Sequence, residues 1–302
     1  MPLAKFKFAP GINKEGTEYT AEGSWFDSDK IRFRSGYPEK IGGWEKYSSG
    51  TYLGTARSLH QWDDLGGTDY MGIGTNLKWY VELGGGYNDI TPIRATTSAG
   101  DVTFSATDGS STVTITDTSH GAVTGDFVTF SAAASLGGNI TATVLNQEYQ
   151  ILLVTSANAY TITAKDTSGS TVTANSSDSG NGGSNTVGAY QINTGLDTYV
   201  SSTGWGSGTW SRGTWGSADA NAENLRLWSQ DNFGEDLIGN PRGGGLYYWD
   251  TSGGVSSRAT NFTSLGTASD VPLLVNQIMV SEVDRHIIAF GSNSISATSV
   301  LD

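Results

Sequence analysis

Apolar positions along this chain come in short runs separated by glycine, asparagine, aspartate and serine, and these runs predict β-strands almost throughout. They are rich in valine, isoleucine, threonine and aromatic residues, which suit pleated, half-buried positions. No stretch of 12 residues carries the stripe of an amphipathic helix. The expected strands cover residues 57–62, 70–74, 77–82, 112–116, 127–130, 148–154, 160–164, 225–229, 245–250, 277–281 and 286–290. Many short strands separated by regular turn signals predict an all-β sandwich, barrel or propeller.

The tryptophans divide this all-β chain. There are nine, and none lies between Trp79 and Trp205. That gap is rich in threonine, serine, alanine, glycine and valine, and it ends in a Gly/Ser-rich linker composition. A change of composition of this size indicates a separate domain inserted in a connection. The predicted segments are an N-terminal extended arm (1–56), a first propeller-like blade (57–97), an inserted small β-barrel or β-sandwich with its linker (98–187) and further propeller-like blades (188–302).

The outer segments repeat a rhythm of strand and turn. Residues 57–93 and 225–259 each hold three strand-like runs, and a further unit begins at residue 277. Units of roughly 35–45 residues have the size of a propeller blade. Closed propellers have about four to eight blades. We therefore expect a propeller-like body that ends before closure: it is open, is part of a longer protein, or is completed by partners.

Charge is unevenly distributed. The formal net charge is -13, yet residues 1–60 hold nine basic and seven acidic residues, whereas the rest of the chain holds eight basic and 23 acidic ones. This acidic balance argues against a basic nucleic-acid-binding domain. Because cysteine is absent, disulfides, cysteine-ligated zinc and a cysteine nucleophile are excluded. No apolar run approaches the ~18 residues of a membrane helix, and residues 1–8 lack a signal-peptide core. Membrane insertion is not expected.

The basic residues of the arm concentrate where basic and apolar residues alternate. Lys30, Arg32 and Arg34 share one face of a strand, whereas Ile31 and Phe33 share the other. One interpretation is a half-buried strand with a solvated basic face. A second is a contact with acidic neighbouring subunits, and a third is direct phosphate binding. The candidate subunit-contact residues are Lys30, Arg32, Arg34 and Trp44.

The histidines do not indicate a metal or catalytic site. His60, His120 and His286 are isolated and lack metal-ligand spacing. We expect His120 to serve a turn before Gly121 and His286 to be exposed. His60 is either a packed strand residue or a site residue.

The carboxylate pairs and glycine runs do not indicate a catalytic, calcium or phosphate site either. The pairs Asp63-Asp64 and Glu235-Asp236 fit solvated loops, because sequence adjacency does not place two carboxyls across a cleft. No spacing indicates a calcium loop. The glycines at 243–245 precede a strand and not a helix, so they do not form a phosphate loop. We expect no catalytic residues, metal or cofactor.

A five-residue tryptophan repeat stands in a glycine-rich frame. Its members, Trp205, Trp210 and Trp215, are candidates for partner docking or glycan stacking. Tryptophan is favoured at interface hot spots. Packing within the domain is the other interpretation.

The N-terminal sequence carries the most specific motifs. They are Pro10-Gly11-Ile12 and Arg34-Ser35-Gly36-Tyr37-Pro38-Glu39-Lys40-Ile41-Gly42-Gly43-Trp44. This pattern resembles the start of tail nozzle proteins, or packaged-DNA stabilisation proteins, of short-tailed phages, in which such segments precede a β-propeller. Residues 74–80 look like a blade hairpin of these proteins, and residues 287–292 are similar to an inner blade strand. The resemblance covers roughly residues 8–94 and 188–302.

The insertion resembles a small β decoration domain that is common in phage tail and fibre proteins. It carries His120-Gly121-Ala122-Val123-Thr124-Gly125-Asp126, followed by Tyr149-Gln150-Ile151 and Tyr160-Thr161-Ile162-Thr163. Val123 stands for the leucine expected soon after His-Gly, and Ala122 displaces it, so the turn is expected to differ in register. This resemblance implies an adhesive or decorating role without chemistry.

Together the resemblances imply a non-enzymatic virion protein of the phage tail, assembled in the host cytoplasm. They imply a homo-oligomeric, hexameric ring below the portal and adaptor proteins, near tail-fibre proteins. The ring would retain packaged DNA and conduct it at ejection. Because neutralised phosphates add affinity, an acidic lumen would let double-stranded DNA slide. The alternative is a receptor-binding, baseplate or tail-fibre-associated adhesion protein that binds host glycans. A glycan depolymerase is a third and weaker alternative.

Overall fold

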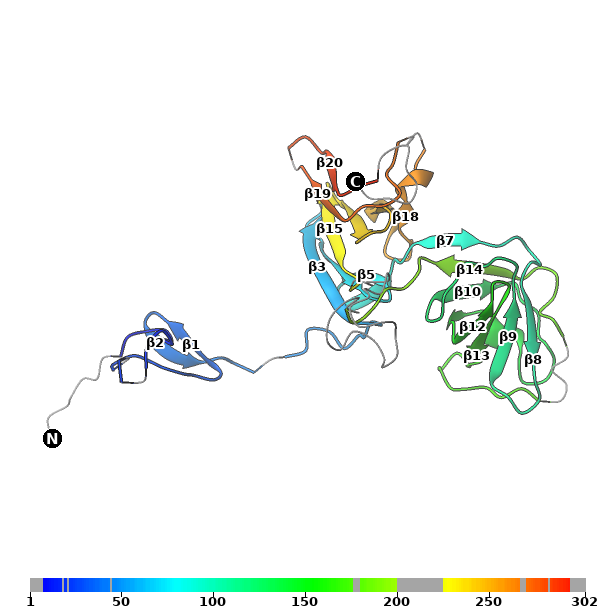
Figure 1. The fold of residues 1–302 in the computed structure, drawn as a ribbon, viewed down its shortest axis with the longest axis horizontal. Helices are drawn as coiled ribbons and strands as arrows, with labels where there is room; N and C mark the ends of the chain where they lie inside the picture. Colours follow the sequence, from blue (N-terminus) through cyan, green and yellow to red (C-terminus); the bar gives the residue numbers. More distant parts are fainter. Residues whose placement is uncertain are drawn as a thin grey trace, which may run out of the picture. The chain divides into compact units, whose positions relative to one another are not determined.

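The computed structural model describes residues 8–175, 180–199, 225–266, 270–281 and 283–293, apart from positions 18, 21 and 44. These residues form an almost entirely β structure (Figure 1), which confirms the predicted all-β class. The one α-helix among them is α1, Ala142–Leu145. The chain divides into two compact units, Met1–Ser49 and Gly50–Asp302.

A β-hairpin forms the regular part of the first unit. Strands β1 (Ile31–Arg34) and β2 (Tyr37–Lys40) pair antiparallel. The two turn residues, Ser35 and Gly36, have φ angles of 50° and 82°. Positive φ at both central positions matches the two-residue turns whose twist suits a hairpin.

Blade-like sheets build the body of the second unit. Two are four-stranded antiparallel meanders in chain order, the arrangement of a propeller blade. The first contains β3 (Ala56–Asp63), β4 (Asp69–Thr75), β5 (Trp79–Leu83) and β6 (Gly86–Asp89). The second contains β15 (Trp228–Phe233), β16 (Asp236–Pro241), β17 (Tyr247–Trp249) and β18 (Thr260–Asn261). The hairpin of β19 (Gln277–Val280) and β20 (Ile287–Phe290) packs against β15 and β16, while β15 packs against β3 and β4.

Tryptophans fill the interface between the two meanders. Trp62, Trp79, Trp228 and Trp249 all belong to one buried apolar cluster. The ring of Trp228 lies on Gly74 of β4 so closely that a Cβ there would stand 2.4 Å from the indole. These four tryptophans of the outer segments therefore serve the packing of the two sheets.

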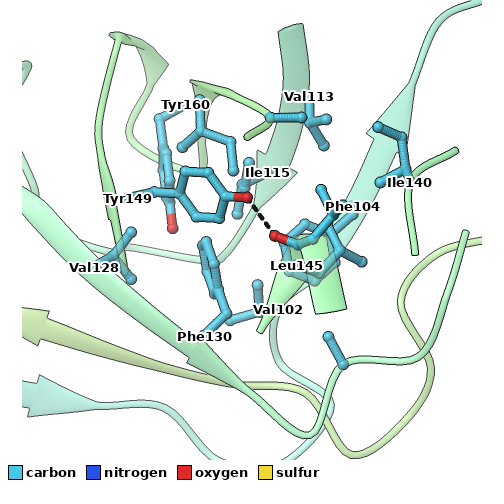
Figure 2. Close-up of a cluster of buried hydrophobic side chains, with 14 of the residues drawn as sticks. Val102, Phe104, Val113, Ile115, Val128, Phe130, Ile140, Leu145, Tyr149 and Tyr160 are labelled. Atoms are coloured by element: carbon cyan, nitrogen blue, oxygen red, sulfur yellow. Dashed lines mark hydrogen bonds between the residues drawn. The ribbon is translucent and has the colours of Figure 1, made fainter. Parts of the chain in front are cut away.

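The inserted β-sandwich consists of two further four-stranded sheets between β6 and β15. One has the order β11 (Glu148–Gln150), β10 (Phe127–Ser131), β14 (Val187–Gln191) and β7 (Ile93–Thr96). The other has the order β12 (Leu153–Ser156), β13 (Ala159–Thr163), β9 (Thr112–Thr116) and β8 (Thr103–Ala106). Figure 2 shows aromatic and aliphatic side chains of both sheets pointing toward one another in a core that includes Phe104, Phe130 and Tyr160.

The strands that enter and leave the sandwich, β7 and β14, pair with each other. Both chain connections to the body therefore lie at one end of the sandwich. The boundaries of the four segments expected from the sequence remain predictions.

Several local expectations differ from the structure. Strands β6, β7, β8 and β14 were not among the expected strands, and the third strand-like run expected within residues 225–259, at 255–259, is not a strand. The single strand expected at 148–154 is two strands, β11 and β12, in different sheets. The chain changes sheet there because Ile151 donates to Asp126 O while Leu152 donates to Thr161 O. Strand β16 was not expected, since its sequence contains Gly239 and Pro241 and therefore looks like a turn.

Candidate functional site

The two carboxylate pairs singled out in the sequence meet in one pocket. It has a volume of about 380 Å³ and lies where the β3–β4 and β15–β16 connections approach each other. The side chains remain solvent-accessible, as expected of loop charges, but their convergence was not predicted. The charged residues that line the pocket are Asp63, Asp64, Glu235, Asp236 and Arg285.

Several of these carboxylates hold the pocket's own loops. Asp64 Oδ1 accepts a hydrogen bond from Thr68 N at 2.8 Å, and Glu235 Oε1 accepts one from Leu65 N at 2.7 Å. The Thr68 bond is the main reason that the pKa of Asp64 lies below its ordinary value. Asp236 accepts hydrogen bonds from Tyr248 and Thr251. These carboxylates are therefore already engaged in fixing loop geometry.

Asp63 differs from its neighbours. It stands directly opposite Asp69 in the β3–β4 register. A hydrogen bond between the two carboxyl groups is the largest cause of the raised pKa of Asp63. Two like charges at opposite positions destabilise a strand pair. This end of the pocket would therefore be stabilised by a cationic group.

In the part of the chain that the structure describes, none of the three histidines belongs to a metal-binding cluster, and His60 packs against its neighbours. His60 is half-buried, stacks on Trp62 with ring centroids 5.9 Å apart, and lies 3.3 Å from Asn232 Oδ1. His286 is exposed, as expected. Among the described residues, no group of three or more histidine, aspartate or glutamate side chains is placed to hold a metal ion.

His120 both ends its turn and enters the sandwich core. Its ring is buried, accepts a hydrogen bond from Ala122 N at 3.0 Å through Nδ1, and lies 4.9 Å from the Tyr160 ring. Nε2 lies 3.1 Å from Ser156 O. The turn role predicted from the His-Gly sequence is therefore accompanied by a packing role.

Asp126, the last residue of the same motif, connects the turn to the exit strand. Its carboxylate accepts hydrogen bonds from Val123 N at 2.9 Å, Thr194 N at 2.9 Å and Asn193 Nδ2 at 2.5 Å. The side chain is buried. The carboxylate thus ties the start of β10 to the chain that returns to the body.

A buried ion cluster joins the sandwich to both meanders. Lys78 is only 3% exposed, and its ammonium contacts Asp89 at 2.6 Å and Glu148. It also lies 4.4 Å from the centre of the Phe127 ring. Arg258, in the β17–β18 connection of the second meander, contacts Asp89 at 3.2 Å and Glu148 at 3.3 Å. The four charges therefore link three parts of the second unit.

The ion cluster lies between two apolar cores that do not merge. The apolar cores of the sandwich and of the meanders are separate clusters. Burial raises the pKa of Asp89, but Lys78 and Arg258 outweigh it and leave that pKa below its ordinary value. Sequence reasoning missed Lys78, Glu148 and Arg258. The only signal was a lysine within the apolar run 77–83.

The candidate contact residues of the arm lie on the β1–β2 hairpin where the structure describes them. Arg32 and Arg34 are exposed, while Ile31 and Phe33 are partly buried. Phe33 packs edge-on against Trp25 at 6.1 Å. Lys30 was expected on the same strand face, but it lies just before β1 with a φ of 56°, so it is outside the strand; its side chain is exposed. The alternation read from the sequence thus separates a packed face from a solvated basic face.

Four candidate residues lie outside the described residues. They are Trp44, Trp205, Trp210 and Trp215. Their proposed contacts remain predictions.

No helix in the described part of the chain is long and apolar enough to cross a membrane. No family model and no curated protein matches the sequence. Among solved structures, an endosialidase of phage phi92 is similar to 78% of this chain at 15% identity and a TM-score of 0.22. The match covers 33% of that protein, so the chain spans about a third of its length. A TM-score this low supports no inference about family or function.

Proposed function

We propose that this chain is a non-enzymatic structural protein of a phage tail. Within the tail it would be a nozzle or tube component that forms a homo-oligomeric, hexameric ring below the portal and adaptor proteins. The ring would retain packaged DNA and conduct it during ejection. The proposal rests on the motif resemblances of the arm and of the insertion.

The observation that carries the proposal is the form of the arm. The segment that bears the most specific motif folds as a β-hairpin in a compact unit of its own. Its basic face is solvated rather than packed. A separate unit with an exposed charged face suits a protein that assembles through its N-terminal arm.

Electrostatics supports a conducting role. Residues 61–302 hold eight basic and 23 acidic residues. Each phosphate that a protein neutralises releases counterions and strengthens DNA binding. A lumen lined by carboxylates would therefore leave DNA free to slide.

The site chemistry agrees with a structural role. In the acidic pocket, Asp64, Glu235 and Asp236 accept hydrogen bonds from neighbouring loop groups. These carboxylates stabilise turns, a function that needs no substrate. The ion cluster around the buried Lys78 likewise joins the sandwich to the meanders, which is a structural role.

Particles assembled without this chain test the proposal. We expect DNA-filled heads that lose their genome, measured as nuclease-sensitive DNA, and restoration of DNA retention when the chain is supplied in trans. Normal DNA retention in its absence would refute the proposed role.

The adhesion alternative depends on Trp205, Trp210 and Trp215, outside the described residues. Binding of the isolated chain to host glycans on an array, lost when these three residues are replaced by alanine, would favour that alternative.

A further inference from the structure

The β1–β2 hairpin presents a basic face that is only partly neutralised. Residues 30–40 contain four basic residues and one acidic residue. The acidic one, Glu39, stands opposite Arg32 and contacts it at 3.3 Å. Within the described residues Arg34 makes no ion pair, and its cross-strand neighbour Tyr37 is 74% exposed. The hairpin therefore offers two guanidinium groups on one face with a single carboxylate to neutralise them.

The other face of the hairpin is already occupied. Ile31 and Phe33 point away from the arginines, and Phe33 packs on Trp25, which in turn packs on Phe8 at 5.8 Å. The basic face is therefore the one left for a partner.

The acidic pocket has the complementary character. Four carboxylates and one arginine line its 380 Å³ volume, and Phe233 and Tyr248 form part of its wall. At its rim Asp63 and Asp69 oppose each other in neighbouring strands. Guanidinium groups bind carboxylates in a planar, forked geometry and tolerate apolar contact along their stems. The pocket suits an arginine side chain in charge and in lining.

We propose that the basic face of the β1–β2 hairpin docks into the acidic pocket of a second copy of this chain. The inference rests on the assembly role proposed above and names its contact. Arg32 and Arg34 are the docking residues. The principal acceptors are Asp63 and the Glu235 carboxylate, through the oxygen that does not accept from Leu65 N. Because the two surfaces differ, the contact is head-to-tail, the type that closes into a ring or continues as a filament.

Two complementary variants test this contact in the full-length chain. R32E/R34E reverses the charge of the hairpin and leaves the pocket intact. D63K alters the pocket and leaves the hairpin intact, and it retains the fold because the new cation stands opposite Asp69. We expect wild-type chains to associate in sedimentation velocity at low salt, and each variant alone to associate at least tenfold more weakly. A mixture of the two variants should form a one-to-one dimer, because one competent contact remains.

Controls separate this contact from a general effect of charge. K14E/K46E makes the same change in net charge within the arm but away from the hairpin, and should leave association within twofold of wild type. D63N/E235Q provides a second pocket variant that should also weaken association. Equal weakening by K14E/K46E would overturn the proposal. So would a mixture of R32E/R34E and D63K that stays monomeric, the result expected if the hairpin docks within its own chain.

The outcomes also distinguish this inference from the proposed function. If the mixture fails to dimerise but the chain is found as a ring in the tail, only the arm-to-pocket contact is wrong. If the mixture dimerises but particles lacking the chain retain their DNA, the contact stands and the tail function is wrong.

Discussion

Trp79 and Trp228 stack across the two four-stranded meanders with ring centroids 5.2 Å apart and an interplanar angle of 25°. Trp79 is fully buried, and its indole nitrogen donates to Gln230 Oε1 at 2.7 Å. The pair fits only because glycines face both rings. A Cβ at Gly239 would lie 2.3 Å from the Trp79 ring. The orientation of the two sheets therefore depends on glycine inside strands.

Substitution G239A tests this packing. Since the new methyl group would overlap the Trp79 ring, we expect destabilisation of about 1–3 kcal/mol or more, the range for overpacking. Urea unfolding monitored by tryptophan fluorescence measures it. Control variant G86A adds a Cβ whose nearest contact is an ordinary 3.4 Å, so its midpoint should stay near that of wild type. Equal midpoints for both variants would contradict the packing account.

Substitution K78M tests the ion cluster. It removes the buried cation but leaves Arg258 in contact with Asp89 and Glu148. The cost should therefore stay below the ~3–5 kcal/mol of removing one member of an isolated buried pair. We expect a lower unfolding midpoint and faster proteolytic separation of the sandwich from the meanders. The comparison is R32M, which removes an exposed pair with Glu39 and should cost about 0–1 kcal/mol. If K78M were as mild as R32M, the cluster would not hold the sandwich.

Acid should weaken the same cluster. The folded state lowers the pKa of Asp89 from its ordinary value of 3.8. A carboxyl with a lowered folded pKa contributes stability that is present above the unfolded value and is lost as pH falls through the folded value. Wild-type stability should therefore decrease with acidification below about pH 5. Variant D89N should show a shallower decrease in urea midpoints over the same range, and parallel curves would exclude Asp89 as a contributor.

The motif carboxylate of the sandwich should matter for stability. Variant D126A removes four hydrogen bonds to a buried carboxylate and leaves Val123 N and Thr194 N without that acceptor. Hydrogen bonds to charged groups contribute about 1.5–3 kcal/mol each, so we expect a loss of several kcal/mol. The exposed Asp166, which caps a turn through Ser168 and Ser170, provides the comparison: D166A should lower the urea midpoint much less than D126A does. The urea unfolding midpoints of both variants measure this difference, and equal midpoints would contradict the role of Asp126.

Much of the fold was predictable from local pattern. Strand β9 has the bounds read from the sequence, and the basic and apolar residues of β1 separate onto two faces as the two-residue period requires. Strand β16 was not predictable, because its Gly239 is required by the Trp79 ring of another sheet, which leaves no room for a Cβ. The local sequence pattern does not show which residues are required by contacts with residues distant in the sequence.

The candidate site was less predictable for the same reason. Asp63-Asp64 and Glu235-Asp236 are about 170 residues apart in the sequence and meet only because β15 packs against β3. Lys78 and Glu148 meet across the joint of the sandwich. The sequence shows that these charged residues exist, but their proximity follows only from the packing of the sheets.

The most direct test of the proposed tail function is the position and copy number of this chain in intact virions, measured by electron microscopy. The account predicts a closed ring of identical copies below the portal and adaptor, with the N-terminal hairpin of each copy at the next copy and carboxylates along the channel. A chain found only at fibre tips, absent from the particle, or forming a strongly basic channel wall would contradict it.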